Sequence, residues 1–150
     1  MGIIMLDTND IGKVFDPITA SVEKGRLSRF AKAIGENNLI YIDDAAAKNA
    51  GYDTLPVPPT FLFCLKMDVP EPFENYEKLG VSLQKLLHAN QSFEYFNAAV
   101  AGDVLTFNSV VEDIYAKKGG ALEFLIEKTT VVNQREEHIA DLVTTLVIRN

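Results

Sequence analysis

The sequence is poor in the residues that mark several common classes of protein. Cys64 is the only cysteine, so no disulfide can form within the chain, which suits a reducing compartment. Basic residues are also few, since 14 Lys and Arg stand against 21 Asp and Glu and the formal net charge is -7. Such a surface disfavours broad contact with nucleic acid or anionic membranes, because both depend on Lys and Arg that neutralise phosphates.

Long hydrophobic runs are absent as well. No stretch approaches the roughly 18 consecutive apolar residues of a membrane-spanning helix. The opening segment MGIIMLDTNDIGK lacks the basic start and the apolar length of a signal peptide. We therefore expect a cytoplasmic protein. Its 150 residues, 47% of them hydrophobic, suffice to bury one core, and we expect residues 1–150 to form a single domain.

The first half of the chain carries helical patterns. Apolar residues recur at i, i+3, i+4 and i+7 from Leu27 to Ile34, which predicts an amphipathic helix with Ser21 as its N-cap. A second, shorter helix is expected to begin at Asp43 or Asp44. The proline-rich segment YDTLPVPPTF then forces an extended, rigid loop. The apolar run 61–67 that follows it predicts a buried helix.

The second half changes to a period of two, which is typical of strands. Alternating side chains predict strands around 88–96 and 104–111, and further strands over 121–132 and 139–149, separated by short turns. We expect a three- to four-stranded antiparallel meander. Helices in the first half and strands in the second predict an α+β fold. Because the sheet must bury one face, the 61–67 helix is expected to lie against it, as in a curved antiparallel sheet wrapped around a central helix, the hotdog arrangement.

Three segments carry a resemblance to a known family, namely VEKGRLSRFAKAIGENNLIYIDDAAAKNAGY (22–52), PPTF (58–61) and LHANQSFEYFNAAVAGD (87–103). In this order the chain resembles the MaoC-like hotdog dehydratases. It is most similar to their FAS1-like dehydratase N-terminal branch, which includes the non-catalytic subunit of the mycobacterial (3R)-hydroxyacyl-ACP dehydratase. The resemblance implies reversible hydration of a trans-2-enoyl thioester to the (R)-3-hydroxyacyl thioester. No separate cofactor is implied, since the substrate carries CoA or phosphopantetheine.

Catalytic members of that family carry the motif Asp-x-Asn-Pro-x-His after the first helix. In this chain the resemblance places Glu36 at the aspartate position and keeps Asn38, but Leu39 replaces proline and Tyr41 replaces histidine. A tyrosine, with an ordinary pKa of about 10, is a poor base at neutral pH. His88 is the candidate to replace the missing histidine of the motif, provided that its strand borders the site. A lone histidine near a strand end is more often a structural or surface residue.

The candidate catalytic residues are therefore Glu36, Tyr41 and His88. The resemblance implies that Asn38, Pro58, Pro59, Thr60 and Phe61 line the substrate-binding site. For each of these, a purely structural role stays open: Glu36 as a helix-terminal acid, Tyr41 as a core aromatic, and the prolines as a rigid loop. No spacing of His, Cys and Asp supports a metal site.

Two functions from different classes follow. The first is an (R)-specific enoyl-thioester hydratase or 3-hydroxyacyl-thioester dehydratase acting on CoA or acyl carrier protein substrates, with Glu36 as the main acid or base. The second is a non-catalytic subunit that binds the acyl chain while a partner with the intact motif does the chemistry. A homodimeric acyl-thioester-binding protein is a third possibility. Either a homodimer or a heterodimer with another hotdog subunit is expected, formed by pairing at sheet edges.

Overall fold

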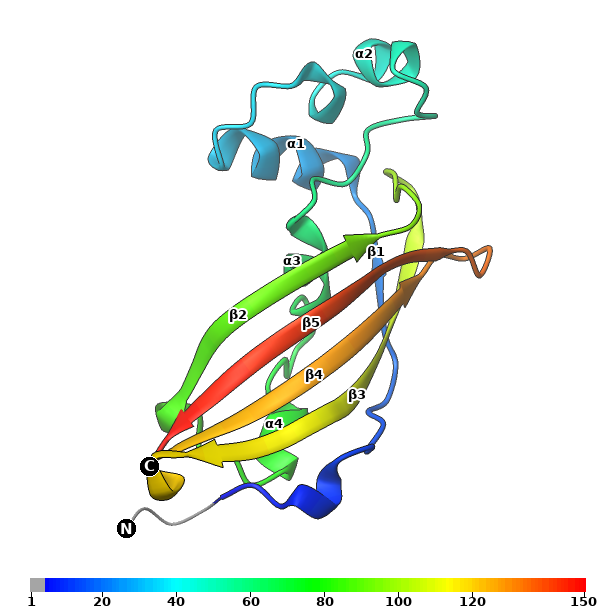
Figure 1. The fold of residues 1–150 in the computed structure, drawn as a ribbon. Helices are drawn as coiled ribbons and strands as arrows, with labels where there is room; N and C mark the ends of the chain where they lie inside the picture. Colours follow the sequence, from blue (N-terminus) through cyan, green and yellow to red (C-terminus); the bar gives the residue numbers. More distant parts are fainter. Residues whose placement is uncertain (1–4) are drawn as a thin grey trace.

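A five-stranded antiparallel sheet organises the chain (Figure 1), and the structure, a computed structural model, describes residues 5–150. The spatial order of the strands is β1-β3-β4-β5-β2. The strands are β1 (Ile18–Ser21), β2 (Leu86–Tyr95), β3 (Val104–Lys117), β4 (Leu122–Val132) and β5 (His138–Arg149).

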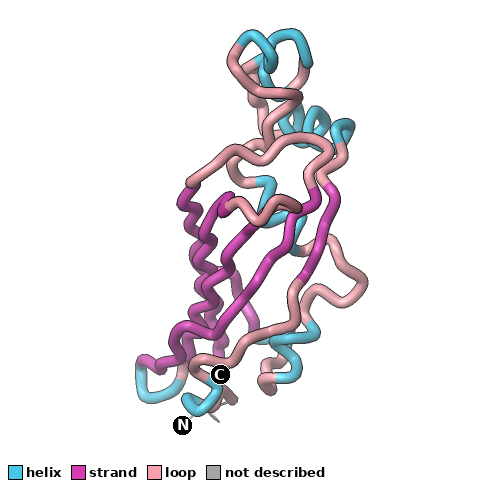
Figure 2. The backbone as a smooth tube through the Cα atoms, turned by 90° about the vertical axis from the view of Figure 1, so that its right-hand side faces the viewer, coloured by secondary structure: helices cyan, strands magenta, loops and turns pink. Residues whose placement is uncertain are grey.

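The helices are short. The α-helices are α1 (Lys24–Ala33), α2 (Asp44–Asn49), α3 (Phe61–Lys66) and α4 (Glu74–Lys78), and the 3-10 helices are η1 (Thr8–Asp10), η2 (Leu39–Tyr41), η3 (Leu83–Lys85) and η4 (Lys118–Gly120). Figures 1 and 2 show α1 and α2 beyond the end of the sheet at which β2 finishes, whereas α3 lies against one sheet face. Within residues 5–150, no helix is long and apolar enough to cross a membrane.

The expected helices are confirmed, with one correction at a cap. Ser21 is not the N-cap of α1, because it ends β1 and pairs with Val104 of β3. Glu23 holds the cap position instead, without a side-chain hydrogen bond to the helix. Asp43 does cap α2, since its Oδ1 accepts from the backbone N–H of Ala46 at 2.8 Å.

The expected meander is right for β3, β4 and β5 and wrong for β2. β2 pairs with β5 at the far side of the sheet and does not pair with β3, which follows it in the sequence. β1 was not expected at all. Alternation shows that a segment is a strand but not which strand lies beside it, and the four residues of β1 are too few to show a period.

The core lies between α3 and the inner face of the curled sheet. Leu62 and Leu65 of α3 are fully buried and pack with Leu105, Phe107 and other strand residues. Each such side chain contributes about 1.5–3 kcal/mol by leaving water. Together, α3 and the curled antiparallel sheet form the α+β hotdog arrangement that the sequence predicts.

A buried ion pair ties α3 to the sheet. The ammonium of Lys66, at the end of α3, contacts the Glu127 carboxylate of β4, and the two side chains are only 4% and 2% exposed. The Tyr76 hydroxyl of α4 donates to the same Oε1 atom at 3.2 Å. Removing one member of such a pair leaves an uncompensated buried charge, which is more costly than removing both charges.

The first prediction concerns this pair. Lys66→Met should lower the free energy of unfolding by about 3–5 kcal/mol, because it leaves the buried Glu127 carboxylate without a counter-ion. The double variant Lys66→Met with Glu127→Gln should regain part of that loss, since the neutral amide oxygen still accepts from Tyr76. Urea unfolding measures both. The control is Lys78→Met, which breaks the exposed Lys78–Glu74 pair and should have little effect; a double variant no better than the single one would contradict the prediction.

Candidate functional site

The loop after α1 is built as a helix C-cap followed by a turn. Gly35 has a φ of +75°, and the N–H of Glu36 donates to the Ala31 carbonyl at 2.9 Å, which ends the helix. The carboxylate of Glu36 accepts from the N–H of Asn38 at 2.8 Å, and Asn38 Oδ1 accepts from the N–H of Ile40 at 3.2 Å. These bonds hold the loop in a fixed shape that carries Tyr41 into a cavity.

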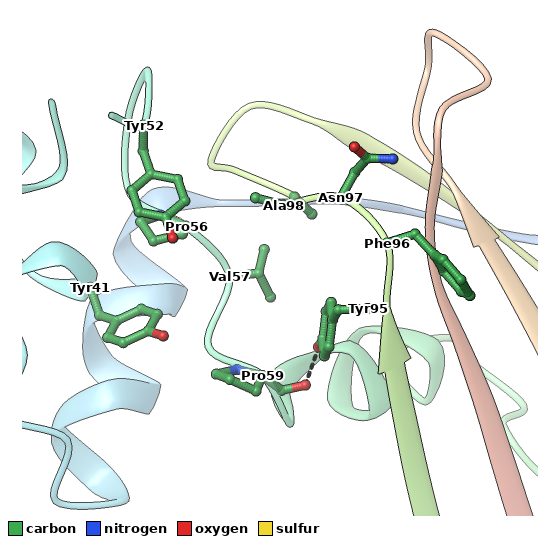
Figure 3. A pocket seen from close by; sticks show the side chains of 10 residues that line it. Tyr41, Tyr52, Pro56, Val57, Pro59, Tyr95, Phe96, Asn97 and Ala98 are labelled. Carbon is green, nitrogen blue, oxygen red and sulfur yellow. Dashed lines mark hydrogen bonds between the residues drawn. The ribbon is translucent and has the colours of Figure 1, made fainter. Parts of the chain in front are cut away.

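The Tyr41 cavity has a volume of about 320 Å³, within the range of small-ligand sites. Figure 3 shows Tyr41 and Tyr52 on one side of it and Tyr95 on the other, beside Pro59. The residues that line it are Tyr41, Tyr52, Pro56, Val57, Pro59, Tyr95, Phe96, Asn97, Ala98 and Ala99. Three tyrosines in an otherwise largely apolar wall give the cavity a few fixed polar groups.

The walls of the Tyr41 cavity meet through backbone pairing. Pro56 forms an isolated antiparallel bridge with Val100, and the N–H of Val57 donates to the Ala99 carbonyl at 2.9 Å. The rigid proline segment therefore runs alongside the chain that leaves β2. This pairing brings Tyr52 and Asn97 to one place although 45 positions separate them in the sequence.

The hydroxyls of Tyr41 and Tyr95 are hydrogen-bond donors rather than bases. Burial raises the pKa of Tyr41 above its ordinary value, and the negative charge of Glu36 and the neighbouring Tyr52 raise it further. Burial, with a smaller effect of Tyr41, also raises the pKa of Tyr95, whose hydroxyl donates to the Pro59 carbonyl. Groups that stay protonated at neutral pH can stabilise negative charge that develops on a substrate oxygen.

The structure brings some of the predicted site residues together. Tyr41 and Pro59 line the same cavity, and Glu36 is near enough for its charge to act on Tyr41. Asn38 is exposed and caps η2. Thr60 is exposed at the start of α3.

Pro58 and Phe61, two other predicted lining residues, are buried and are not among the residues that line the cavity. The centroids of the Phe61 and Phe30 rings are 4.7 Å apart, and the Arg26 guanidinium lies over the Phe61 ring, 5.4 Å from its centroid. Within this chain Phe61 therefore packs in the core.

His88 lies far from the Tyr41 cavity. It occupies the third position of β2, while Tyr95 ends that strand, so seven residues at about 3.3 Å each place them roughly 23 Å apart. The imidazole stacks on Phe63, 4.8 Å between ring centroids. The expectation that His88 approaches Glu36 is therefore not met within one chain.

Sequence reasoning missed Tyr52, Tyr95 and Asn97 as lining residues. Only five tyrosines occur in the chain, and three of them meet here. No local pattern marks them, because their proximity depends on long-range pairing. Within residues 5–150, no three His, Cys, Asp or Glu side chains converge in a way that would hold a metal ion.

Comparison with known proteins places the chain in a class. It belongs to the family described as "FAS1-like, dehydratase domain region", which matches residues 9–142. A UPF0336 protein of Streptomyces avermitilis is 32% identical over 146 residues, covering 96% of this chain and 95% of that protein. Another UPF0336 protein, from Thermobifida fusca, is 31% identical over 140 residues, covering 93% of this chain and 91% of that protein.

Solved structures confirm the hotdog fold. A chain of the C-terminally truncated HadBC (3R-hydroxyacyl-ACP dehydratase) complex from Mycobacterium tuberculosis matches with a TM-score of 0.80 at 22% identity, over 96% of this chain and 99% of that one. A chain of the ChsH1-ChsH2 complex of the same organism matches with a TM-score of 0.74 at 20% identity, over 91% of this chain and 84% of that one. The R-hydratase PhaJ1 from Pseudomonas aeruginosa matches with a TM-score of 0.69 at 16% identity, over 93% of this chain and 82% of that one.

The second prediction tests the coupling of Glu36 to Tyr41. Glu36→Gln removes the negative charge that disfavours the tyrosinate, so the pKa of Tyr41 should fall. It should remain above about 10, because burial, the larger cause, persists. NMR titration of ring-labelled tyrosine, assigned with Tyr41→Phe, follows the change. Glu112→Gln, an exposed position on β3, should leave the midpoint unchanged; equal midpoints for Glu36→Gln and the unsubstituted protein would show that the two groups are not coupled.

Proposed function

We propose that this chain is the acyl-thioester-binding subunit of an (R)-specific enoyl-thioester hydratase or 3-hydroxyacyl-thioester dehydratase, and that a second hotdog subunit supplies the catalytic imidazole. The observation that carries the proposal is the Tyr41 cavity. It holds three tyrosines beside the Glu36 carboxylate, and neither of the chain's two histidines lines it. The family to which the chain belongs and the dehydratases that share its fold support the reaction class.

The reaction explains why the missing histidine matters. Hydration bonds a water oxygen to Cβ, releases one proton from that water, and adds a proton at Cα. The acid and the base must therefore both reach one Cα–Cβ bond. Tyr41, whose pKa is raised by burial and by the charge of Glu36, can donate a hydrogen bond to the thioester oxygen as enolate charge develops there. Its hydroxyl does not supply the base that histidine supplies in the family motif.

A second candidate rests on one observation that favours it. Glu36 is half-buried and its charge acts on Tyr41, so a carboxylate and a hydroxyl do lie near one another. In that case, the chain is a self-sufficient hydratase or dehydratase in which Glu36 serves as the acid or base and Tyr41 donates a hydrogen bond.

The free edge of the sheet supports pairing with another hotdog subunit. β2 is an outermost strand of ten residues, and Glu94 is the one Asp, Glu, Lys or Arg among them. Strand edges that avoid pairing are commonly protected by lysine or proline, and β2 contains neither. Leu87 on this strand and Phe96 just after it are each 48% exposed. Both HadBC and ChsH1-ChsH2 are complexes, which is consistent with such a partner.

The third prediction separates the two candidates by turnover. The purified chain alone, given crotonyl-CoA and longer trans-2-enoyl-CoAs, should leave the enoyl-thioester absorbance unchanged. Turnover should appear when a hotdog subunit with the Asp-x-Asn-Pro-x-His motif is added. Glu36→Gln in that complex should change the rate little. Turnover by the lone chain that Glu36→Gln abolishes, with circular dichroism unchanged, would replace the first candidate with the second.

The fourth prediction concerns the β2 edge. Leu87→Lys should weaken association with the second hotdog subunit about tenfold or more, because it removes apolar burial and places a charge at the strand edge. Light scattering over a concentration series measures the association. Val14→Lys makes a comparable apolar-to-lysine change at a residue that is 72% exposed and lies outside β2, so it should leave association intact. Equal effects of the two substitutions would argue against β2 as the interface.

A further inference from the structure

A second cavity of about 380 Å³ lies between α3, α4 and the inner face of the sheet. Its wall is mostly apolar and includes Phe63 of α3 and Leu146 of β5. The polar side chains in the wall are Tyr76, His88 and Thr144. Apolar cavities of this size with a few placed polar groups are typical of small-molecule sites.

A β-bulge places His88 in this cavity. His88 pairs with Leu146 and Asn90 pairs with Thr145, so Ala89 is the extra residue on β2. Beyond the bulge, Gln91 pairs with Thr144. Directly paired residues point to the same face, and Leu146 and Thr144 are both buried on the inner face. Without the extra residue, His88 and Gln91 would point to opposite faces of the sheet.

The hydrogen bonds around Gln91 determine what His88 offers to a ligand. Gln91 Nε2 donates to the Ser92 carbonyl at 3.3 Å, which fixes the orientation of the amide. Gln91 Oε1 accepts from the Thr144 hydroxyl at 2.8 Å and lies 3.1 Å from His88 Nε2. Because an amide oxygen only accepts, His88 Nε2 carries the proton, and Nδ1 of the neutral ring is an acceptor.

The other polar groups of the cavity donate to protein atoms. The Tyr76 hydroxyl donates to Glu127 Oε1, and the Thr144 hydroxyl donates to Gln91 Oε1. Within residues 5–150, His88 Nδ1 has no hydrogen-bond donor. The ring plane is held by its stack on Phe63, at 27° between the two planes. His88, which is itself exposed, thus brings one hydrogen-bond acceptor to a mostly apolar wall.

We infer that this cavity binds an aliphatic chain that bears a hydroxyl group, and that the hydroxyl donates to His88 Nδ1. A methylene group takes up roughly the volume of a water molecule, about 30 Å³, so a chain of about ten to twelve carbons fits. Gln91 acts as a positioning residue that sets the tautomer of His88. The identification of the aliphatic ligand as the acyl part of a thioester rests on the proposed function. The binding of a hydroxylated aliphatic ligand does not depend on it.

The experiment uses a reporter built into the cavity. The chain contains no tryptophan, so Leu83→Trp at the partly exposed rim gives a single fluorophore that senses occupancy. Decanoic acid and 10-hydroxydecanoic acid are titrated against this variant, and calorimetry on the unsubstituted chain checks that Leu83→Trp leaves both Kd values unchanged. The hydroxylated probe should bind about three- to tenfold more tightly, the worth of one hydrogen bond. In the Leu83→Trp background, His88→Phe keeps an aromatic ring over Phe63 and should make the two Kd values equal, whereas His138→Phe should preserve the preference.

Four outcomes would overturn the inference: equal Kd values for the two probes, a preference that survives His88→Phe, calorimetric binding without a change in fluorescence, or no binding of either probe. The probes are free acids, so no turnover is needed. A lack of turnover by the complex with the second hotdog subunit would therefore count against the proposed function alone, while the binding data decide the inference separately.

Discussion

The position of α3 is the constraint on which the rest of the structure depends. The helix has only six residues, and its buried apolar side chains are Phe61, Leu62 and Leu65. The ion pair between Lys66 and Glu127 fixes the end of α3 beside β4, because a buried ammonium must contact a buried carboxylate. With the end of α3 held at β4, its start lies next to Pro59 and the Tyr41 cavity, and Phe63 faces the second cavity.

Elements with a strong local signal could be predicted from the sequence, and elements set by distant partners could not. The helix from Leu27 to Ile34 and the Asp43 cap follow from spacing and capping chemistry within a few residues. The placement of β2 beside β5 follows from none of these. It is decided by which inner face can be buried, and that depends on residues some 50 positions away.

The candidate site divides in the same way. Glu36 and Tyr41 are five residues apart in one tight turn, so a motif in the sequence suffices to place them together. Tyr52 and Tyr95 join them only because Pro56 bridges to Val100. His88 illustrates the limit most clearly, since a single extra residue in β2 decides which face of the sheet it occupies and the length of the strand decides how far it lies from Tyr41.

A cavity that lacks a base can still determine which molecules react. Hydrogen-bond donors fixed by burial cost no reorganisation when charge develops on a substrate oxygen, and this contribution survives the loss of histidine. The base need only reach the same Cα–Cβ bond, and a neighbouring chain can bring it there. If the chemistry is shared with a second subunit, as proposed, the inner face of this chain need not hold catalytic groups. Side chains there, such as His88 and Gln91, can then take up the recognition of the bound chain.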